Sequence, residues 1–497
     1  MWTREALHET AAGLLAGRKF IVLANREPYM HLRDGDDVRW IEPASGVTSA
    51  LDPVLRACGG TWVGHGSGEA DRDVVDEHDR LGVPPDDPAY TLRRVWLTRE
   101  EEEGYYFGFA NEALWPLCHL AYHRPTFRAS DWEAYVAVNR KFAEAVLAEA
   151  AGEPAFVFVQ DYHFALVPRM LKEARPDLVV AQFWHIPWPN PEAYRICPWR
   201  KDLLLGLLGN DLLGFHTQYH CNNFLETVDR ELEARIDREG FAVVLGGQPT
   251  RVRPFPISID FGEYDLAPED PPFRAATEHW RRRIGLRNVH IGLGVDRLDY
   301  TKGIPERLAA VERLFETRPE WIERFTFIQV GVPSRTHIAA FRRLLDDVEA
   351  QVERINWRFQ TRRWRPILLL TEHHGRGSLV AAYRLADLCI VSSLHDGMNL
   401  VAKEFVASRT DGRGVLVLSP FAGAARDLTE AVIVNPFAVD EFAEGLRVAL
   451  EMPGEEQEQR MSALRGRVRE RNVFTWVAEI LEEAEDLLRS QVMQEVS

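Results

Sequence analysis

Two cations follow a predicted strand in the second half of the chain. Arg297 and Lys302 lie within residues 294–303, at and after the end of the apolar run 289–295. A guanidinium can bind two phosphate oxygens at once, whereas an ammonium acts as a point charge, so the two together suit a diphosphate. Open parallel sheets bind their ligands beyond the carboxyl ends of the strands. The segment therefore predicts a diphosphate-binding loop, although a solvated basic loop is the simpler alternative.

A second segment, residues 395–404, follows another apolar run at 388–391. It begins with an Asp-Gly turn at Asp396, and a helix is predicted after the turn. The free backbone N–H groups of a helix N-terminus can bind an anion or sugar hydroxyls. Glu404 lies further along this largely apolar helix, where a carboxylate suits a ribose diol. The turn alone would indicate only a connection, but with Glu404 the two segments predict a nucleotide-sugar pocket.

Polar residues of the first half also lie at predicted strand ends. Arg26 closes the first predicted strand, where it could bind a sugar phosphate or pair with an acid such as Glu27. Asp161 follows the strand 155–159, and a carboxylate there can accept a hydrogen bond from an attacking hydroxyl. His185 follows the next strand, and a structural histidine is the alternative interpretation.

Aromatic residues and further cations extend these candidates. Tyr106 and Trp115 are predicted around a helix, where rings can stack on sugar faces, although core packing is the favoured explanation for a single aromatic residue. Arg335 follows the strand 325–330, and Arg376 opens a helix, so each could add positive charge to the same cleft.

The charge balance disfavours nucleic acid as a partner. The 497 residues include 59 Lys and Arg against 76 Asp and Glu, a formal net charge of −17, whereas phosphate backbones require basic surfaces. No apolar run approaches the length of a membrane span, so we expect no membrane insertion. Five scattered cysteines without a C-x-x-C pair argue against a disulfide framework and a zinc site, and they fit a reducing cytoplasm.

Short β-branched runs alternate with longer amphipathic stretches, which predicts parallel sheets with helices on both faces. We expect an α/β chain of two Rossmann-like domains facing across a cleft. The first covers residues 1–258, the second covers residues 259–474, and a last helix at 475–497 returns to the first domain. The proline-rich stretch 256–273 predicts the linker. Predicted strands cover residues 20–24, 155–159, 178–184, 212–215, 289–295, 325–330, 367–371, 388–391, 415–418 and 431–434, and predicted helices include 132–150 and 304–317.

From about residue 20 to residue 476 the chain resembles the trehalose-6-phosphate synthase family, whose members are retaining glycosyltransferases of the two-domain GT-B fold. The segments that carry the resemblance are 161–163, 185–187, 294–303, 396–404 and 419–425. Matches of this length in this order are specific for the family and less specific for the acceptor. The resemblance implies glucose transfer from a nucleoside-diphosphate glucose to glucose 6-phosphate, giving trehalose 6-phosphate.

The resemblance also implies roles for individual residues. His185 and Asp161 would position the transferring glucose and the acceptor hydroxyl, while Arg297 and Lys302 would stabilise the leaving nucleotide. The implied donor site comprises Ser45, Gly46, Arg297, Lys302, Arg376, Asp396, Gly397, Met398, Asn399, Leu400 and Glu404. The implied acceptor site comprises Arg26, Tyr106, Trp115, Asp161, Tyr162 and Arg335. A phosphate oxygen of the leaving group would take the acceptor's proton, so the resemblance implies neither a metal nor another cofactor.

Departures from the family pattern concern a donor loop and the acceptor. Residues 45–47 read Ser-Gly-Val where the family has Gly-Gly-Leu near the donor, so we expect a different loop geometry there. His65 stands where many members carry Trp. Residues 25–29 resemble the start of the glucosylglycerol-phosphate synthases, which use glycerol 3-phosphate. Arg335 favours a sugar-phosphate acceptor. Trehalose 6-phosphate synthesis is the favoured reading, with glycerol 3-phosphate or another phosphorylated acceptor as the alternative.

Other classes of function fit less well. A silent regulatory homologue would be expected to lose Arg297, Lys302 or Glu404, and all three are present. A pseudo-glycosyltransferase joining cyclitols would show rebuilt donor and acceptor sites, and a carbohydrate-binding module needs no diphosphate site. We expect small-molecule substrates and a separate downstream phosphatase. The sequence leaves open whether the donor carries uracil, adenine or guanine, and whether the chain forms a homo-oligomer.

Overall fold

The computed structural model describes residues 2–15, 17–35, 37–43, 46–267, 271–284 and 289–496. The chain divides into two compact units. Unit 1 comprises Met1–Ile257 together with Val473–Ser497, and unit 2 comprises Ser258–Asn472. Each unit is built on its own β-sheet. Within the described parts of the chain, no helix is long and apolar enough to cross a membrane.

A mixed sheet forms the centre of unit 1, with the strand order β10-β11-β12-β9-β8-β7-β1-β4-β6-β5. Strands β12 to β6 of this order run parallel, whereas β10, β11 and β5 pair antiparallel at the two edges. The middle strands β7, β8 and β9 are buried along their whole length, as expected for continuous apolar runs in a parallel sheet. The strands are β1 Lys19–Arg26, β4 Thr61–His65, β5 Arg80–Val83, β6 Tyr90–Val95, β7 Ala155–Gln160, β8 Val179–Phe183, β9 Leu212–Phe215, β10 Arg235–Asp237, β11 Ala242–Leu245 and β12 Gln248–Pro254.

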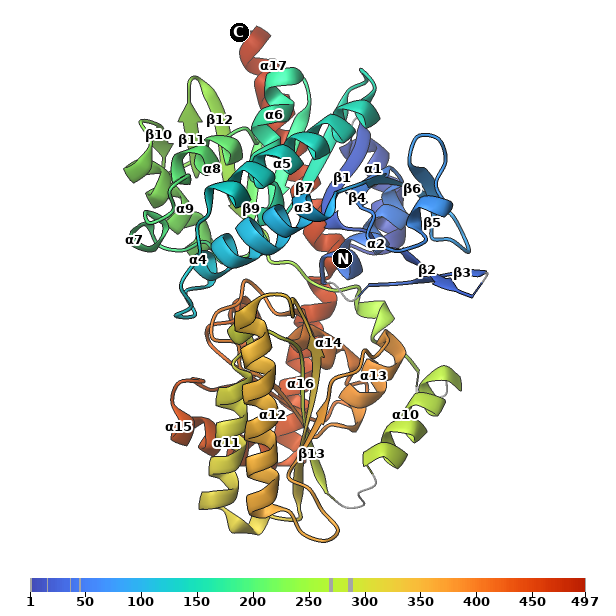
Figure 1. Ribbon diagram of the computed structural model, residues 1–497, viewed down its shortest axis with the longest axis vertical. Helices are drawn as coiled ribbons and strands as arrows, with labels where there is room; N and C mark the ends of the chain where they lie inside the picture. Colours follow the sequence, from blue (N-terminus) through green and yellow to red (C-terminus); the bar gives the residue numbers. More distant parts are fainter. Residues whose placement is uncertain are drawn as a thin grey trace. The chain divides into compact units, whose positions relative to one another are not determined.

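Helices cover this sheet, and α5 packs on strands β1, β4 and β6 (Figure 1). The hairpin β2–β3, Met30–Asp34 with Asp37–Ile41, pairs outside the main sheet. The helical segment η2 is a π-helix, a rare form that is frequent at functional sites. The helices of unit 1 are α1 Arg4–Leu14, α2 Gly46–Cys58, α3 Arg99–Glu102, η2 Glu103–Leu114, α4 Trp115–His119, α5 Ala129–Ala150, α6 Val167–Ala174, α7 Pro191–Tyr194, α8 Arg200–Leu207 and α9 Gln218–Glu231, with short turns at η1 Asp71–Asp73 and η3 Tyr162–Phe164.

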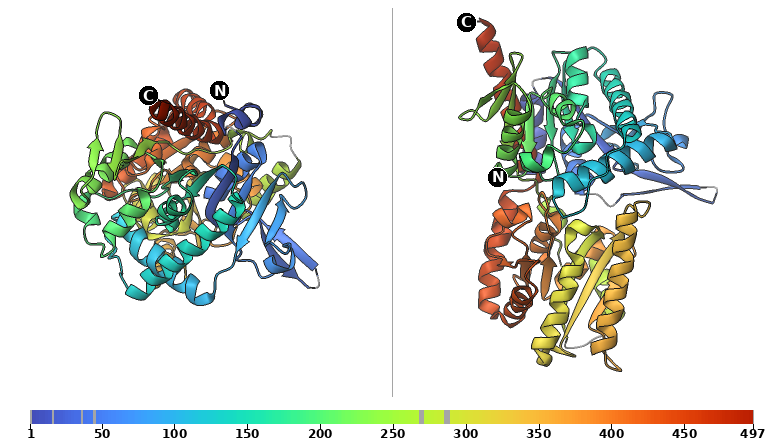
Figure 2. Two further views of the ribbon diagram at one scale, coloured as in Figure 1. Left: turned by 90° about the horizontal axis from the view of Figure 1, so that it is seen from above. Right: turned by 60° about the vertical axis from the view of Figure 1, so that its left-hand side comes forward.

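The last helix, α17 at Val473–Val496, belongs to unit 1 and lies beside α1 (Figure 2, left). Trp476 of this helix is 2% exposed. Its ring meets the Phe183 ring edge-on at 5.1 Å and lies 6.3 Å from the His185 ring. Residues near the C-terminus therefore pack beneath the end of β8.

Unit 2 has a fully parallel sheet with the strand order β15-β14-β13-β16-β17-β18. Helices α11 and α12 run side by side (Figure 1). The strands are β13 His290–Leu298, β14 Phe325–Pro333, β15 Ile367–Leu370, β16 Leu388–Val391, β17 Val415–Leu418 and β18 Val432–Ile433. The helical segments are η4 Phe261–Glu263, α10 Pro271–Ile284, η5 Tyr300–Lys302, α11 Ile304–Thr317, η6 Pro319–Trp321, α12 Ala339–Phe359, α13 Arg376–Leu385, α14 Leu400–Ser408, η7 Gly423–Arg426, α15 Val439–Glu451 and α16 Gly454–Glu470.

The predicted linker 256–273 is wrong in part. Within it η4 forms a helical turn, and α10 begins at Pro271. Proline is favoured in the first turn of a helix, because the N–H group that proline lacks would have no helical partner there. Pro271 and Pro272, which helped to predict a break, therefore lie at the start of a helix. Residues 268–270 lie outside the described residues.

Candidate functional site

The cations Arg297 and Lys302 lie at the carboxyl end of β13. Arg297 is still part of the strand, opposite Val332 of β14, and Lys302 closes the short turn η5. Asp299 between them accepts hydrogen bonds from the Thr301 amide and hydroxyl, each at 3.0 Å. Burial alone would raise the pKa of Asp299, but the charges of Arg335, Arg297 and Lys302 outweigh it and lower that pKa. The loop is therefore electropositive locally, around Asp299.

A short ion pair joins the two predicted motifs. Lys302 Nζ lies 2.5 Å from Asp396 Oδ2, and both side chains are 13% exposed. The same carboxylate oxygen accepts a hydrogen bond from Ser393 Oγ at 3.1 Å and from Asn399 Nδ2 at 3.3 Å. Residues 94 positions apart in the sequence thus meet where β13 and β16, which are neighbours in the sheet, come to an end.

The backbone around this pair is tightly packed. Gly303 has φ of +63°, and a Cβ atom on it would lie 2.1 Å from the Ser392 carbonyl oxygen. Asn399 also has positive φ, +80°, and its side chain caps α14 by accepting from the Ala402 amide at 3.3 Å. Ala424 N–H donates to the Met398 carbonyl at 2.8 Å. These constraints fix the segment 396–400 ahead of the helix.

Glu404 of α14 is held by two tyrosines. Tyr383 Oη donates to Glu404 Oε2 at 2.7 Å, and Tyr264 forms a second side-chain hydrogen bond. Burial raises the pKa of Glu404, while the two hydrogen bonds and Arg376 act in the opposite direction. Arg376 opens α13 as predicted and forms an ion pair with Glu263.

Arg335 lies in unit 2 with a left-handed backbone, φ of +51°. Its guanidinium lies 3.3 Å from Asp299 Oδ2, and both side chains are almost fully buried. The guanidinium also lies over the Phe341 ring at 5.4 Å. The structure therefore places this proposed acceptor residue beside the electropositive loop of unit 2.

In unit 1, Arg26 and Tyr106 come together at the end of β1. Arg26 Nη2 lies 3.5 Å from Tyr106 Oη, at the limit of a hydrogen bond. The Tyr106 ring stacks on the His163 ring, with centroids 5.7 Å apart and planes 11° apart. The acid that follows, Glu27, does not pair with Arg26 in this structure but with Arg94. Arg26 thus stays exposed at the strand end.

Asp161 and His185 also meet in unit 1. Asp161 has φ of +71°, an uncommon backbone conformation that clusters at functional sites. Its carboxylate accepts from the Tyr162 and His185 amides at 2.9 and 3.1 Å. His185 Nε2 lies 2.9 Å from the Gln160 amide oxygen, which can only accept, so Nε2 carries the proton. Burial, followed by His216 and His163, lowers the pKa of His185, so its ring is neutral at neutral pH.

Two predicted acceptor residues have buried side chains. Trp115 is 5% and Tyr162 is 1% exposed, and their ring centroids lie 5.8 Å apart. Tyr162 Oη donates to Asn111 Oδ1 at 2.9 Å. Their acceptor role stays a prediction, and packing accounts for their position.

Gly46 is exposed at the start of α2, and Ser45 lies outside the described residues.

The sequence did not indicate a buried ionic cluster that includes Glu27, the residue after Arg26. Arg94 of β6 is fully buried, and its guanidinium lies 2.8 Å from both Glu27 Oε2 and Asp71 Oδ1 and 2.9 Å from His31 Nδ1. Glu27 Oε1 accepts from the Ser67 amide at 2.9 Å. Burial and the neighbouring Asp71 carboxyl raise the pKa of Glu27 to about 8, against the effect of Arg94. No local motif signals this cluster, because its members are far apart in the sequence.

Comparison with known proteins identifies relatives along nearly the whole chain. The model of "Glycosyltransferase family 20" matches residues 18–486. The bifunctional trehalose-6-phosphate synthase/phosphatase of Thermoproteus tenax is 38% identical over 469 residues, which cover 92% of this chain. The chain spans 62% of the length of that relative. The trehalose-6-phosphate synthase of Mycobacterium marinum is 38% identical over 496 residues, covering 97% of each chain.

A solved structure is similar over most of the chain as well. It is the UDP-forming α,α-trehalose-phosphate synthase of Burkholderia xenovorans in complex with glucose 6-phosphate. Its TM-score to this protein is 0.83 at 30% identity, and the match covers 94% of this chain and 100% of the other. The predicted fold class, α/β with Rossmann-like sheets of the GT-B type, is confirmed by this similarity and by the parallel sheets of both units.

Proposed function

This chain belongs to glycosyltransferase family 20, the family of the trehalose-6-phosphate synthases, and we propose that it transfers glucose from UDP-glucose to glucose 6-phosphate with retention of configuration, forming trehalose 6-phosphate. It is a glycosyltransferase, and the proposal concerns its donor, its acceptor and its stereochemistry. Support for the substrates comes from the Burkholderia relative, whose reaction is UDP-forming and whose structure holds glucose 6-phosphate.

The observation that carries the proposal is the 2.5 Å contact between Lys302 and Asp396. It links the cationic loop after β13 to the helix-capping segment before α14. In the proposed donor complex, Arg297 and Lys302 bind the diphosphate, and the backbone from Asp396 to Leu400 binds the glucose hydroxyls. Glu404, held by its tyrosines, binds the ribose, and Arg376 faces the phosphates.

The proposed chemistry follows from charge. Departure of UDP develops negative charge on the diphosphate, and cations that are already in place stabilise it without reorganisation. The sugar develops oxocarbenium character, and the acceptor attacks from the side of the leaving group. A phosphate oxygen then takes the proton of the acceptor hydroxyl. This course uses no metal, no other cofactor and no enzymic nucleophile.

On the acceptor side, the proposal assigns residues of unit 1. Arg26 and Tyr106 bind the acceptor phosphate, and the strained Asp161 orients the attacking hydroxyl. His185, with a neutral ring whose Nε2 proton is directed at Gln160, positions the transferring glucose. Trp115 and Tyr162 shape the wall behind these groups.

Product analysis by mass spectrometry tests the proposal. UDP-, ADP- and GDP-glucose are each offered with glucose 6-phosphate and with glycerol 3-phosphate. We expect a phosphorylated disaccharide from UDP-glucose and glucose 6-phosphate, and NMR of the new linkage should show both anomeric centres as α. Product from glycerol 3-phosphate alone would replace the acceptor assignment with glucosylglycerol-phosphate synthesis.

A matched variant makes the assay specific for the site. Lys302→Ala removes the proposed diphosphate contact, whereas Lys201→Ala removes an exposed cation at the start of α8. Transfer should fall with the first variant only. No transfer to either acceptor by the unmodified protein would contradict the proposed reaction.

A further inference from the structure

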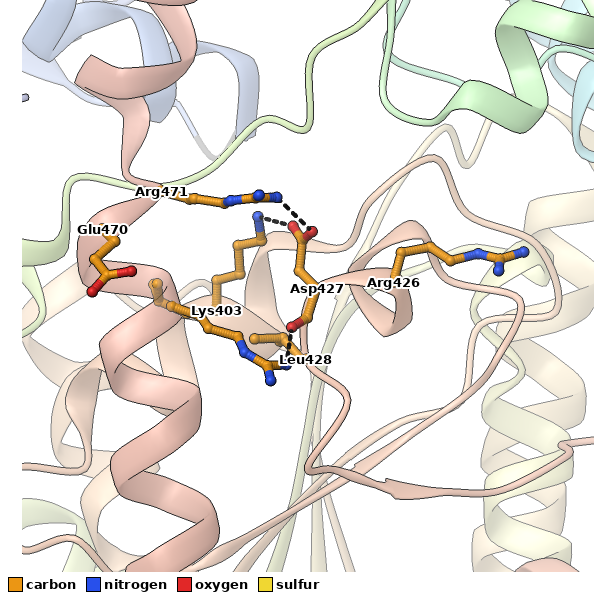
Figure 3. Close-up of a pocket in the computed structure, with 8 residues that line it drawn as sticks. Lys403, Arg426, Asp427, Leu428, Glu470 and Arg471 are labelled. Carbon is orange, nitrogen blue, oxygen red and sulfur yellow. Dashed lines mark hydrogen bonds and ion pairs between the residues drawn. The ribbon is translucent and has the colours of Figure 1, made fainter. Parts of the chain in front are cut away.

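A cavity of about 310 Å³ lies in unit 2 beside the helix that carries Glu404. Its lining comes from α14, from the residues around the end of η7 and from the C-terminal end of α16. This volume is at the lower end of the roughly 300–1,000 Å³ that small-molecule sites occupy. The charged lining residues are Lys403, Arg426, Asp427, Arg467, Glu470 and Arg471 (Figure 3).

The charge of this lining opposes that of the chain. The lining has four cations and two carboxylates, and therefore a surplus of two positive charges. The whole chain has 59 Lys and Arg against 76 Asp and Glu. Positive charge is therefore concentrated at this cavity although the protein is acidic overall.

Three of the cations gather around Asp427, as Figure 3 shows for Lys403 and Arg471. Lys403 is 2% exposed at its side chain, and its Nζ lies 3.1 Å from Asp427 Oδ2. Arg467 Nη1 donates to the Asp427 carbonyl at 2.8 Å. Arg471 lies 3.7 Å from Asp427 Oδ1, beyond hydrogen-bond distance, and its side chain is 66% exposed. Arg426 extends away from this group (Figure 3).

A structural role explains only part of this arrangement. Cations near the end of a helix are favoured by its dipole, and Asp427 offsets one charge. Arg467 lies on the last turn of α16, where it also pairs with Glu430 at 2.7 Å, and Arg471 is the C-cap residue. Lys403 and Arg471 therefore share the single Asp427 carboxylate. A phosphate group would offset the remaining positive charge, because guanidinium and ammonium groups bind its oxygens with charge-assisted hydrogen bonds.

We propose that this cavity binds a phosphate group, carried either by inorganic phosphate or by a small phosphorylated compound. Lys403 and Arg467 form the base of the site, and the exposed Arg471 closes on the ligand. This binding step does not depend on the function proposed above.

The site is connected to the segment 396–400 through short backbone links. Lys403 precedes Glu404 on α14, and Gly423 N–H of η7 donates to the Asp396 carbonyl at 3.1 Å. Because a ligand at Lys403 and Asp427 contacts both elements, its binding should change the KM for the sugar donor. This consequence, unlike the binding itself, rests on the proposed function.

Isothermal titration of the full chain with inorganic phosphate tests the proposal, with chloride at matched ionic strength as the blank. Arg471→Gln should weaken phosphate binding by about tenfold or more, the loss expected for one charge-assisted hydrogen bond. The control is Arg469→Gln on the same helix, because that side chain is 52% exposed, pairs with Asp265 and does not line the cavity. It should bind phosphate as the unmodified protein does.

Three results separate the alternatives. Absence of saturable phosphate binding, or equal weakening by both variants, overturns the proposal. A titration with glucose 1-phosphate instead of inorganic phosphate identifies which kind of ligand the cavity takes. If glucose 1-phosphate binds more tightly than inorganic phosphate and still depends on Arg471, the ligand is a phosphorylated compound. If the two bind equally well, the cavity recognises the phosphate group alone. Absence of glucose transfer by the unmodified protein, with phosphate binding intact, would contradict the proposed function and leave this phosphate site standing.

Discussion

Replacing Arg94 with methionine should destabilise unit 1 by about 3–5 kcal/mol, the usual cost of removing one partner from a buried ion pair. The guanidinium lies 2.8 Å from carboxylate oxygens of Glu27 and Asp71, and it donates to the carbonyls of Tyr29 and Asp71 at 3.0 and 2.8 Å. Methionine fills similar space but leaves buried acids without their cation. Unit 1 has 257 and 25 residues in its two segments, 282 together, so at about 2.1 cal/mol/K per residue 1 kcal/mol shifts Tm by roughly 1.7 °C, and Tm should fall by about 5–8 °C.

Differential scanning calorimetry measures this shift, with Arg33→Met as the matched control. Arg33 pairs with Asp73 at 2.5 Å, but the two side chains are 58% and 44% exposed. Exposed ion pairs contribute about 0–1 kcal/mol, so this variant should lower Tm by no more than about 2 °C. If Arg94→Met lowers Tm no further than the control does, the buried cluster does not stabilise unit 1 as reasoned here.

Three further predictions concern the site and its surroundings. Lys302→Ala should lower kcat about a hundredfold, the scale for losing one preorganised charge stabiliser, and steady-state kinetics near the normal rate would remove Lys302 from the donor site. Arg26→Ala should raise the KM for glucose 6-phosphate more than the KM for the donor, and an unchanged acceptor KM would contradict its role. The pKa of Glu27 is raised from an ordinary 4.5 to about 8. Between these pH values the folded state retains a proton that the unfolded chain releases, so the free energy of unfolding falls as the pH rises. Glu27→Gln cannot ionise, and its Tm should fall less than that of the unmodified protein between pH 5 and pH 8, whereas parallel pH profiles of Tm would show that Glu27 does not titrate in this range.

Apolar runs with polar flanks predicted several elements with their observed bounds. The strand 212–215 and the helix 304–317 coincide with β9 and α11. β13 extends past the predicted end at Val295, because charged Asp296 and Arg297 ended the apolar run. Inside the fold Asp296 pairs with buried Arg307 at 2.7 Å, and only tertiary structure supplies that partner. The strands β10 to β12, on one side of the sheet of unit 1, were missed because their partly exposed sequences lack such a run.

The candidate site was predictable where its residues are adjacent in sequence. The segments 294–303 and 396–404 each hold several proposed donor residues, so spacing alone indicated them. Their junction at Lys302 and Asp396 was not predictable from spacing, because it depends on β13 and β16 being neighbours in the sheet. The same limit applies to Arg94 and Glu27, which are separated by 67 positions and share no motif.

The packing of Trp476 beneath His185 has a consequence for the order of events during synthesis. Unit 1 begins at the N-terminus but resumes only at Val473, after the whole of unit 2. At translation rates of roughly 5–20 residues per second, the intervening segment from 258 to 472 takes on the order of 10–40 s to emerge. During that interval the nascent chain has β8 without the indole that later covers it. The neighbourhood of His185 is thus completed only after unit 2 has been synthesised, and a ribosome that stalls inside unit 2 leaves apolar surface available to chaperones.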